Sequence, residues 1–65
     1  MLTSETPNIV RTGRYNTTVA ARRLGIHRNT LRLIPEEDLP RHHFDNGRVC
    51  FLGKDLLRYW HTRVS

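Results

Sequence analysis

Residues 19–32 read VAARRLGIHRNTLR, a segment in which two short helical patterns are separated by one glycine. The first pattern predicts a helix over Thr18–Leu24, which the short polar side chain of Asn16 or Thr17 can cap. Gly25 follows at the position where a helix commonly ends in a left-handed residue. The inward face of this helix is predicted to hold Val19, Ala20 and Leu24.

A second helix is predicted to begin at His27 or Arg28 and to end at Ile34 or Pro35. Leu31 and Ile34 are three residues apart and therefore share its inward face. Its outward face then carries Arg28, Asn29 and Arg32, with Thr30 near the boundary. Two short helices around a glycine turn are the helix-turn-helix pattern, whose second helix fits the major groove of DNA.

A hairpin is predicted after the acidic loop at residues 36–38. Asn46-Gly47 is a strong turn signal, and it lies between candidate strands at Pro40–Phe44 and Arg48–Leu52. Alternation along these strands predicts an inward set and an outward set. We expect the inward set to be Phe44, Val49 and Phe51, and the outward set to include Arg48 and Cys50.

A last helix is predicted from about Lys54 to about Thr62, with a stripe of Leu56, Tyr59 and Trp60 facing inward and Leu57 at its edge. Residues 1–14 are polar and aperiodic, so they are predicted to be a flexible tail before one domain at residues 15–65. The expected fold class is therefore α+β, mainly α.

Charge gives the first indication of function. The 65 residues carry a net charge of +5 and a pI near 10.7, and all but Lys54 of the eleven Lys and Arg residues are arginine. Such a basic small domain is typical of nucleic-acid binders, and the guanidinium fork suits phosphates and guanine edges. A solvated basic surface with no partner is the alternative.

Composition excludes several other classes. A single cysteine allows neither a disulfide framework nor a four-cysteine zinc site, and it suits a reducing cytoplasm. No apolar run approaches the ~18 residues of a membrane span, and the N-terminus lacks the pattern of a signal peptide. We expect no membrane association, and a cytoplasmic location in a bacterial host cell.

Four segments together resemble the excisionase-type winged helix-turn-helix, a group related to the DNA-binding domains of mercury-resistance-type regulators. They are Thr18–Leu31, Leu39-Pro40, Gly47–Phe51 and Asp55–Tyr59, and the resemblance runs from about residue 16 to about residue 61. One departure is that Cys50 and Leu52 stand where relatives often carry basic residues. The chain also leaves no residues for the dimerisation helix and effector domain of a full regulator, which favours an excisionase.

The resemblance implies an architectural role without catalysis or cofactor. Excisionases are recombination directionality factors: they bind repeated sites, bend attachment-site DNA and direct a site-specific integrase toward excision. The implied partners are double-stranded DNA, an integrase and further copies loaded cooperatively on DNA. No small-molecule substrate is implied. A small phage or plasmid transcriptional repressor would have the same DNA-binding surface.

Twelve residues are predicted to contact DNA. By resemblance, the second helix contributes Arg28, Asn29, Thr30 and Arg32, the start of the first helix contributes Thr17 and Thr18, and the wing contributes Arg41, His43 and Arg48. Arg22 and Arg23 lie on the helix that crosses the phosphate backbone. His27 stands where relatives often have a serine cap, and because histidine caps poorly we expect it to face a phosphate.

Three other hypotheses compete with DNA binding. His42, His43, Cys50 and His61 lack a convincing fourth ligand, so no metal site is predicted. An enzyme needs a pocket for which the chain has little room, so no catalytic residue is predicted. The third hypothesis is a protein-interaction adaptor, whose outward apolar face would be made by Cys50, Leu52 and Leu57.

Overall fold

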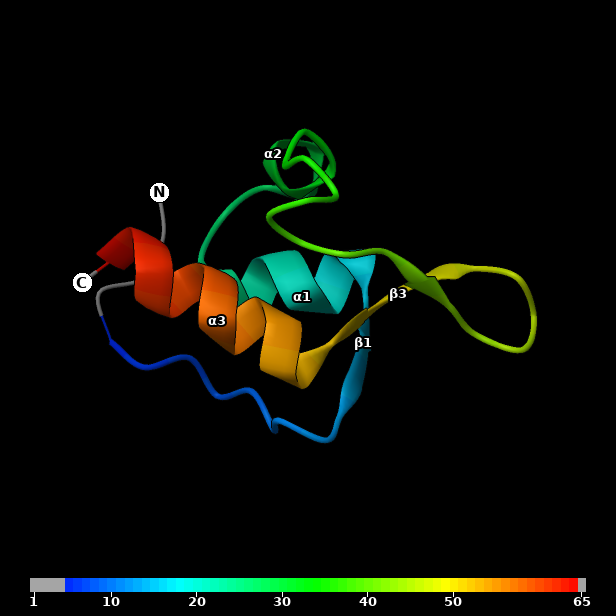
Figure 1. The fold of residues 1–65 in the computed structure, drawn as a ribbon, viewed down its shortest axis with the longest axis horizontal. Coiled ribbons are helices and arrows are strands. Elements are labelled where there is room, and N and C mark those ends of the chain that lie inside the picture. Colours follow the sequence, from blue (N-terminus) through cyan, green and yellow to red (C-terminus); the bar gives the residue numbers. More distant parts are fainter. Residues whose placement is uncertain (1–4, 65) are drawn as a thin grey trace.

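One three-stranded antiparallel sheet and three helices make up residues 5–64, which are the residues described by the computed structural model (Figure 1). Strand β3 lies between β1 and β2, and Tyr15 pairs with Phe51 while His42 pairs with Cys50. The elements, in chain order, are β1 (Arg14–Asn16), α1 (Thr17–Leu24), α2 (Arg28–Arg32), β2 (His42–His43), β3 (Val49–Leu52) and α3 (Gly53–Val64).

The first two helices form at the predicted positions, because local signals mark their starts and the end of α1, although α2 ends at Arg32 rather than at Ile34 or Pro35. The Asn16 side chain caps α1 by accepting a hydrogen bond from the Val19 amide at 2.8 Å. Gly25 ends α1 in the left-handed region, with φ of 81°. The His27 ring caps α2, since its Nδ1 accepts from the Asn29 amide at 3.1 Å. The expectation that His27 caps poorly is therefore wrong.

The core lies around α1, which contacts α2, α3 and the sheet and occupies the middle of the molecule in Figure 1. The predicted inward residues Leu24 and Leu31 are fully buried, and Ile34 is nearly so. On α3, Leu56 is fully buried, and Tyr59 and Trp60 pack against the core while half-buried. These assignments are confirmed, and all of these side chains belong to one core cluster or pack against it.

Strand β1 and the segment before it correct the predicted domain boundary. Of the predicted tail, residues 1–4 lie outside the described residues, whereas Ile9 is buried in the core. The segment also pairs with the start of α3, because the Gly53 amide donates to the Gly13 carbonyl at 2.8 Å and the Lys54 amide to that of Arg11 at 3.0 Å. The described part of this segment therefore belongs to the folded domain.

The faces of β3 also differ from the prediction. Cys50 and Phe51 are both buried, whereas Val49, predicted to face inward, is 37% exposed. Alternation fails because β3 is the middle strand and is covered on both faces at positions 50 and 51. Burial of Cys50 removes it from the outward apolar face that the adaptor hypothesis requires.

Candidate nucleic-acid interface

The outward face of α2 is the first component of the site. Arg28, Asn29, Thr30 and Arg32 are all exposed, as predicted. They are held in this orientation because Leu31 is buried beneath them and His27 fixes the first turn. Neither Arg28 nor Arg32 is in an ion pair with the described residues. The helix therefore presents two guanidinium groups and one carboxamide to solvent.

A groove of about 580 Å³ joins this helix to two other segments. Its walls come from the start of α1, from Arg32 of α2, and from the hairpin tip, which we define as residues 44–49. The lining residues are Asn16, Thr17, Thr18, Arg32, Phe44, Asn46, Arg48 and Val49. No acidic side chain lines the groove, while the first turn of α1 adds the positive end of a helix dipole. The groove is therefore suited to a polyanion.

The hairpin tip has a defined conformation although its side chains are exposed. Gly47 adopts φ of 85°, and the Phe44 amide donates to the Arg48 carbonyl at 2.8 Å. The Asn46 side chain accepts from the Arg48 amide at 3.0 Å. Arg48 and His43 are both exposed, in agreement with their predicted place on the surface. Asn46 lines the groove but was not predicted to do so, although its Asn-Gly turn signal had placed it at the tip.

The α1–α2 turn forms a smaller hollow of about 310 Å³ that Thr18, Arg22, His27 and Arg28 help to line. Arg22 and Arg23 are both exposed in the last turn of α1. Because the His27 Nδ1 accepts the capping bond, its Nε2 carries the ring proton and can donate outward. The cap and the predicted phosphate contact are therefore compatible.

Arg41 is not available to a ligand in the way that was predicted. Its guanidinium donates to the backbone carbonyls of four residues, and its Cζ lies 5.2 Å from the centroid of the Phe51 ring. The four carbonyls belong to Leu31, Arg32, Ile34 and Leu39. Orphan carbonyls at the end of a helix need such donors. Arg41 therefore ties the end of α2 to the hairpin, and its place on the DNA-contacting wing is corrected.

His42 and Cys50, which pair across the hairpin, are both accounted for by the fold. His42 Nε2 lies 3.4 Å from Asp55 Oδ2, and Cys50 is buried as a free thiol. Within residues 5–64, no three His, Cys, Asp or Glu side chains are grouped so that they could hold a metal ion. None of the helices in this part of the chain combines the length and the hydrophobicity that a membrane span requires.

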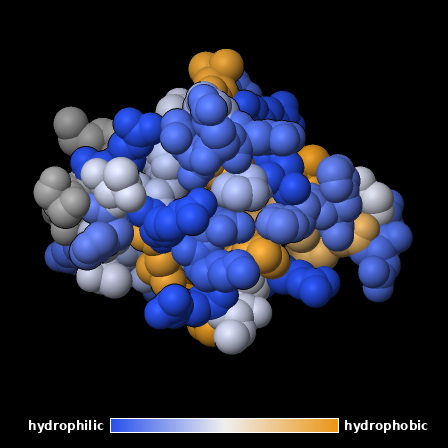
Figure 2. All heavy atoms as spheres, viewed as in Figure 1, coloured by the Kyte–Doolittle hydropathy of each residue, from blue (hydrophilic) through white to orange (hydrophobic). Residues whose placement is uncertain are grey.

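Figure 2 shows hydrophilic side chains over most of the face in view, with apolar residues in separate patches. Ten of the twelve predicted contact residues are exposed and two, Thr17 and Arg41, are half-buried. Thr17, Thr18, Arg32 and Arg48 line one groove. Comparison of the chain with protein-family models, curated proteins and solved structures gave no match.

Proposed function

We propose that this protein is a winged helix-turn-helix that binds double-stranded DNA through α2, the start of α1 and the hairpin tip. The observation that carries the proposal is the groove in which Thr17 and Thr18, Arg32 and Arg48 line one acid-free surface. These residues come from three segments that are far apart in the sequence. Each of these segments supplies hydrogen-bond donors, which is what a phosphate backbone and base edges require.

In the proposed complex α2 enters the major groove, where Arg28 and Arg32 can each form two hydrogen bonds with O6 and N7 of a guanine. Asn29 has the donor and acceptor that match an adenine. The α1 amides and the hydroxyls of Thr17 and Thr18 hold a phosphate. Arg48 at the hairpin tip then reaches the adjacent minor groove or its phosphates, and so sets the register of α2 on the duplex.

The resemblance to excisionases extends this proposal to an architectural role, in which bound copies bend attachment-site DNA and direct an integrase toward excision. A protein with so small a surface makes few contacts with DNA, so strong recognition needs several adjacent copies or a partner protein. A phage or plasmid repressor is the second candidate, because it would use the same surface.

The DNA-binding proposal is tested by fluorescence anisotropy with a labelled duplex of about 20 base pairs, titrated at several salt concentrations. Binding through several phosphates predicts that log K falls linearly with log salt concentration. We expect the double variant Arg28→Ala/Arg32→Ala to weaken binding at least about tenfold. The matched control is Lys54→Ala/Arg58→Ala on α3, which removes the same charge and should lose much less. Equal losses in both variants would contradict the assignment of the interface.

The architectural and repressor roles are separated by two further measurements. An excisionase should change the gel mobility of permuted attachment-site fragments, because it bends them, and should stimulate integrase-dependent excision. A repressor should leave excision unchanged while blocking transcription from a promoter that overlaps its site. Independent filling of the sites on a multi-site fragment would contradict cooperative loading.

A further inference from the structure

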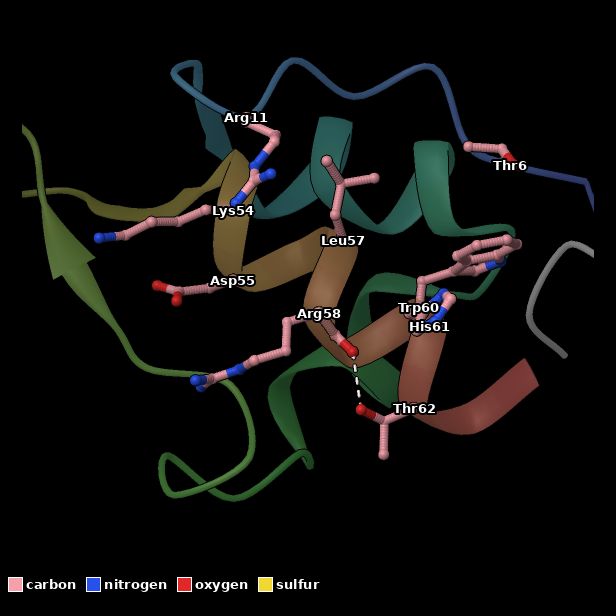
Figure 3. Close-up of a pocket in the computed structure, with 9 residues that line it drawn as sticks. All are labelled: Thr6, Arg11, Lys54, Asp55, Leu57, Arg58, Trp60, His61 and Thr62. Carbon is pink, nitrogen blue, oxygen red and sulfur yellow. Dashed lines mark hydrogen bonds between the residues drawn. The ribbon is translucent and has the colours of Figure 1, made fainter. Parts of the chain in front are cut away.

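A second hollow, of about 670 Å³, lies over α3 and the segment that precedes β1, and it shares no lining residue with the groove described above. Figure 3 shows Leu57 and Trp60 extending from α3 toward the segment that carries Thr6 and Arg11. Both side chains are half-buried and pack against the core, so they are held in place. The hollow therefore has a fixed apolar floor.

The rim of this hollow is basic. Arg11, Lys54 and Arg58 line it and are exposed. Two nearby acids pair with other cations, since Asp38 pairs with Arg63 and Asp55 with His42. Asp55 is the one acid in the lining, and it is 8% exposed. Three exposed cations thus line the hollow together with its apolar floor, and none of them is in an ion pair within residues 5–64.

We propose that this hollow is a docking site for an acidic segment of another protein, one that presents a large apolar side chain flanked by Asp or Glu residues. The apolar side chain would cover Leu57 and Trp60, and the flanking carboxylates would pair with Arg11, Lys54 and Arg58. Charge complementarity of this kind guides encounter and fixes register, while the buried aromatic contributes most of the affinity.

Two other occupants fit the hollow less well. A DNA backbone would match the rim cations but would leave the apolar floor uncovered, and its phosphates would approach the Asp55 carboxylate. A second copy of this chain could offer the acidic run Glu36–Asp38. Within that run, however, Asp38 already accepts a hydrogen bond from Arg63 of its own chain at 3.1 Å. An acidic partner protein is therefore favoured, and the site does not depend on the proposed DNA binding.

Trp60 is the only tryptophan of the chain and provides the readout. The probe is a short synthetic peptide in which a Leu-Phe pair is flanked by Asp and Glu, added to the full-length protein while Trp60 emission is recorded. We expect a saturable blue shift below about 1 mM peptide. A peptide with Lys in place of each acid should give no shift. Absence of a saturable shift with the acidic peptide, or equal shifts with both peptides, would overturn the proposal.

Variants of the rim cations test whether the peptide binds at this hollow. Arg11→Glu/Arg58→Glu should weaken peptide binding at least about tenfold, because two attractive charges become repulsive. Circular dichroism checks that this variant is folded, and Arg28→Ala/Arg32→Ala is the matched control that should bind the peptide normally. Peptide affinity unchanged by the charge reversal would overturn the proposal. A second result would also overturn the proposal. If Trp60 emission shifts with protein concentration in the absence of peptide, and the charge reversal abolishes this shift, the occupant is a second copy of the chain.

DNA binding is measured on the same variants, which keeps the two proposals separable. The charge-reversed variant should bind the duplex much more tightly than Arg28→Ala/Arg32→Ala does. If the charge reversal instead causes the larger loss of DNA affinity, the hollow is a DNA contact and the docking proposal fails. If peptide binding follows the prediction while no variant affects DNA binding, the docking site stands and the DNA-binding proposal fails.

Discussion

The β2–β3 hairpin carries arginine at both ends, and the two arginines act differently. At its base, Arg41 turns inward and donates to carbonyls at the end of α2. At its tip, Arg48 is exposed and lines the groove beside Arg32. The base is thus part of the packing that holds α2, whereas the tip keeps its cation available to an external anion. Residue type alone does not separate these roles, because the number of backbone acceptors within reach decides them.

The largest loss of stability is expected from a substitution at the end of β3, where the base of the hairpin meets the N-terminal segment. A Cβ placed on Gly53 would lie 1.8 Å from the Val10 carbonyl oxygen, so the backbone must move. We expect Gly53→Ala to lower the free energy of unfolding by about 3 kcal/mol, measured by urea denaturation. A loss below about 0.5 kcal/mol would show that the N-terminal segment is not packed against α3 as described.

The second-largest loss of stability is expected from substitution of Arg41. Arg41→Ala removes the donors to the carbonyls at the end of α2 and the cation over Phe51, and should cost about 2 kcal/mol. Arg41→Lys should recover little of this loss, because a compact ammonium cannot replace the planar fork. Urea denaturation of both variants gives the comparison. Full stability in Arg41→Lys would contradict the role assigned to the guanidinium.

A smaller effect is expected within the tip. Gly47 has φ of 85°, and a Cβ there would meet no atom within 4 Å. Gly47→Ala should therefore cost only the strain of a left-handed non-glycine residue, about 1 kcal/mol. Thermal unfolding measures the loss, and Gly47→Asn, which tolerates this conformation better, should recover part of it. Equal losses in both variants would contradict this explanation.

The smallest effect on stability, and a large one on binding, is expected at Arg48. Its side chain is exposed, so Arg48→Ala should change the free energy of unfolding by less than about 0.5 kcal/mol. The proposed phosphate contact predicts weaker binding to all duplexes and a salt slope lower by about one. Anisotropy titrations at several salt concentrations provide this slope. An unchanged slope together with unchanged affinity would exclude the tip from the interface.

The base and the tip also show what the sequence could predict. Signals that act over a few residues were sufficient to predict the ends of α1 and the hairpin turn. Asn16 and Gly25 marked the ends of α1, and Asn-Gly marked the turn. The exposed residues of α2 followed from the spacing of Leu31 and Ile34. These features depend on neighbours in the chain, so the fold class and most of the candidate interface could be predicted.

Features that depend on distant residues were missed. Strand β1 has three residues, too few for a period-two pattern, and it forms because β3 offers a free edge. Burial of Cys50 on the middle strand could not be inferred from alternation alone. Arg41 was assigned to the DNA surface because its acceptors in α2 and just after it lie 7 to 10 residues earlier in the chain. Each miss reflects a partner that only the folded chain brings near.

The proposal that α2, the start of α1 and the hairpin tip bind DNA is best tested by mapping the surface that contacts DNA. Amide chemical shifts of the isotopically labelled protein would be followed by NMR as a duplex of about 20 base pairs is added. We expect the largest changes at residues 28–32, at Thr17 and Thr18, and at residues 46–48, with small changes along α3. Changes concentrated on α3, with α2 and the hairpin tip unaffected, would contradict the proposal.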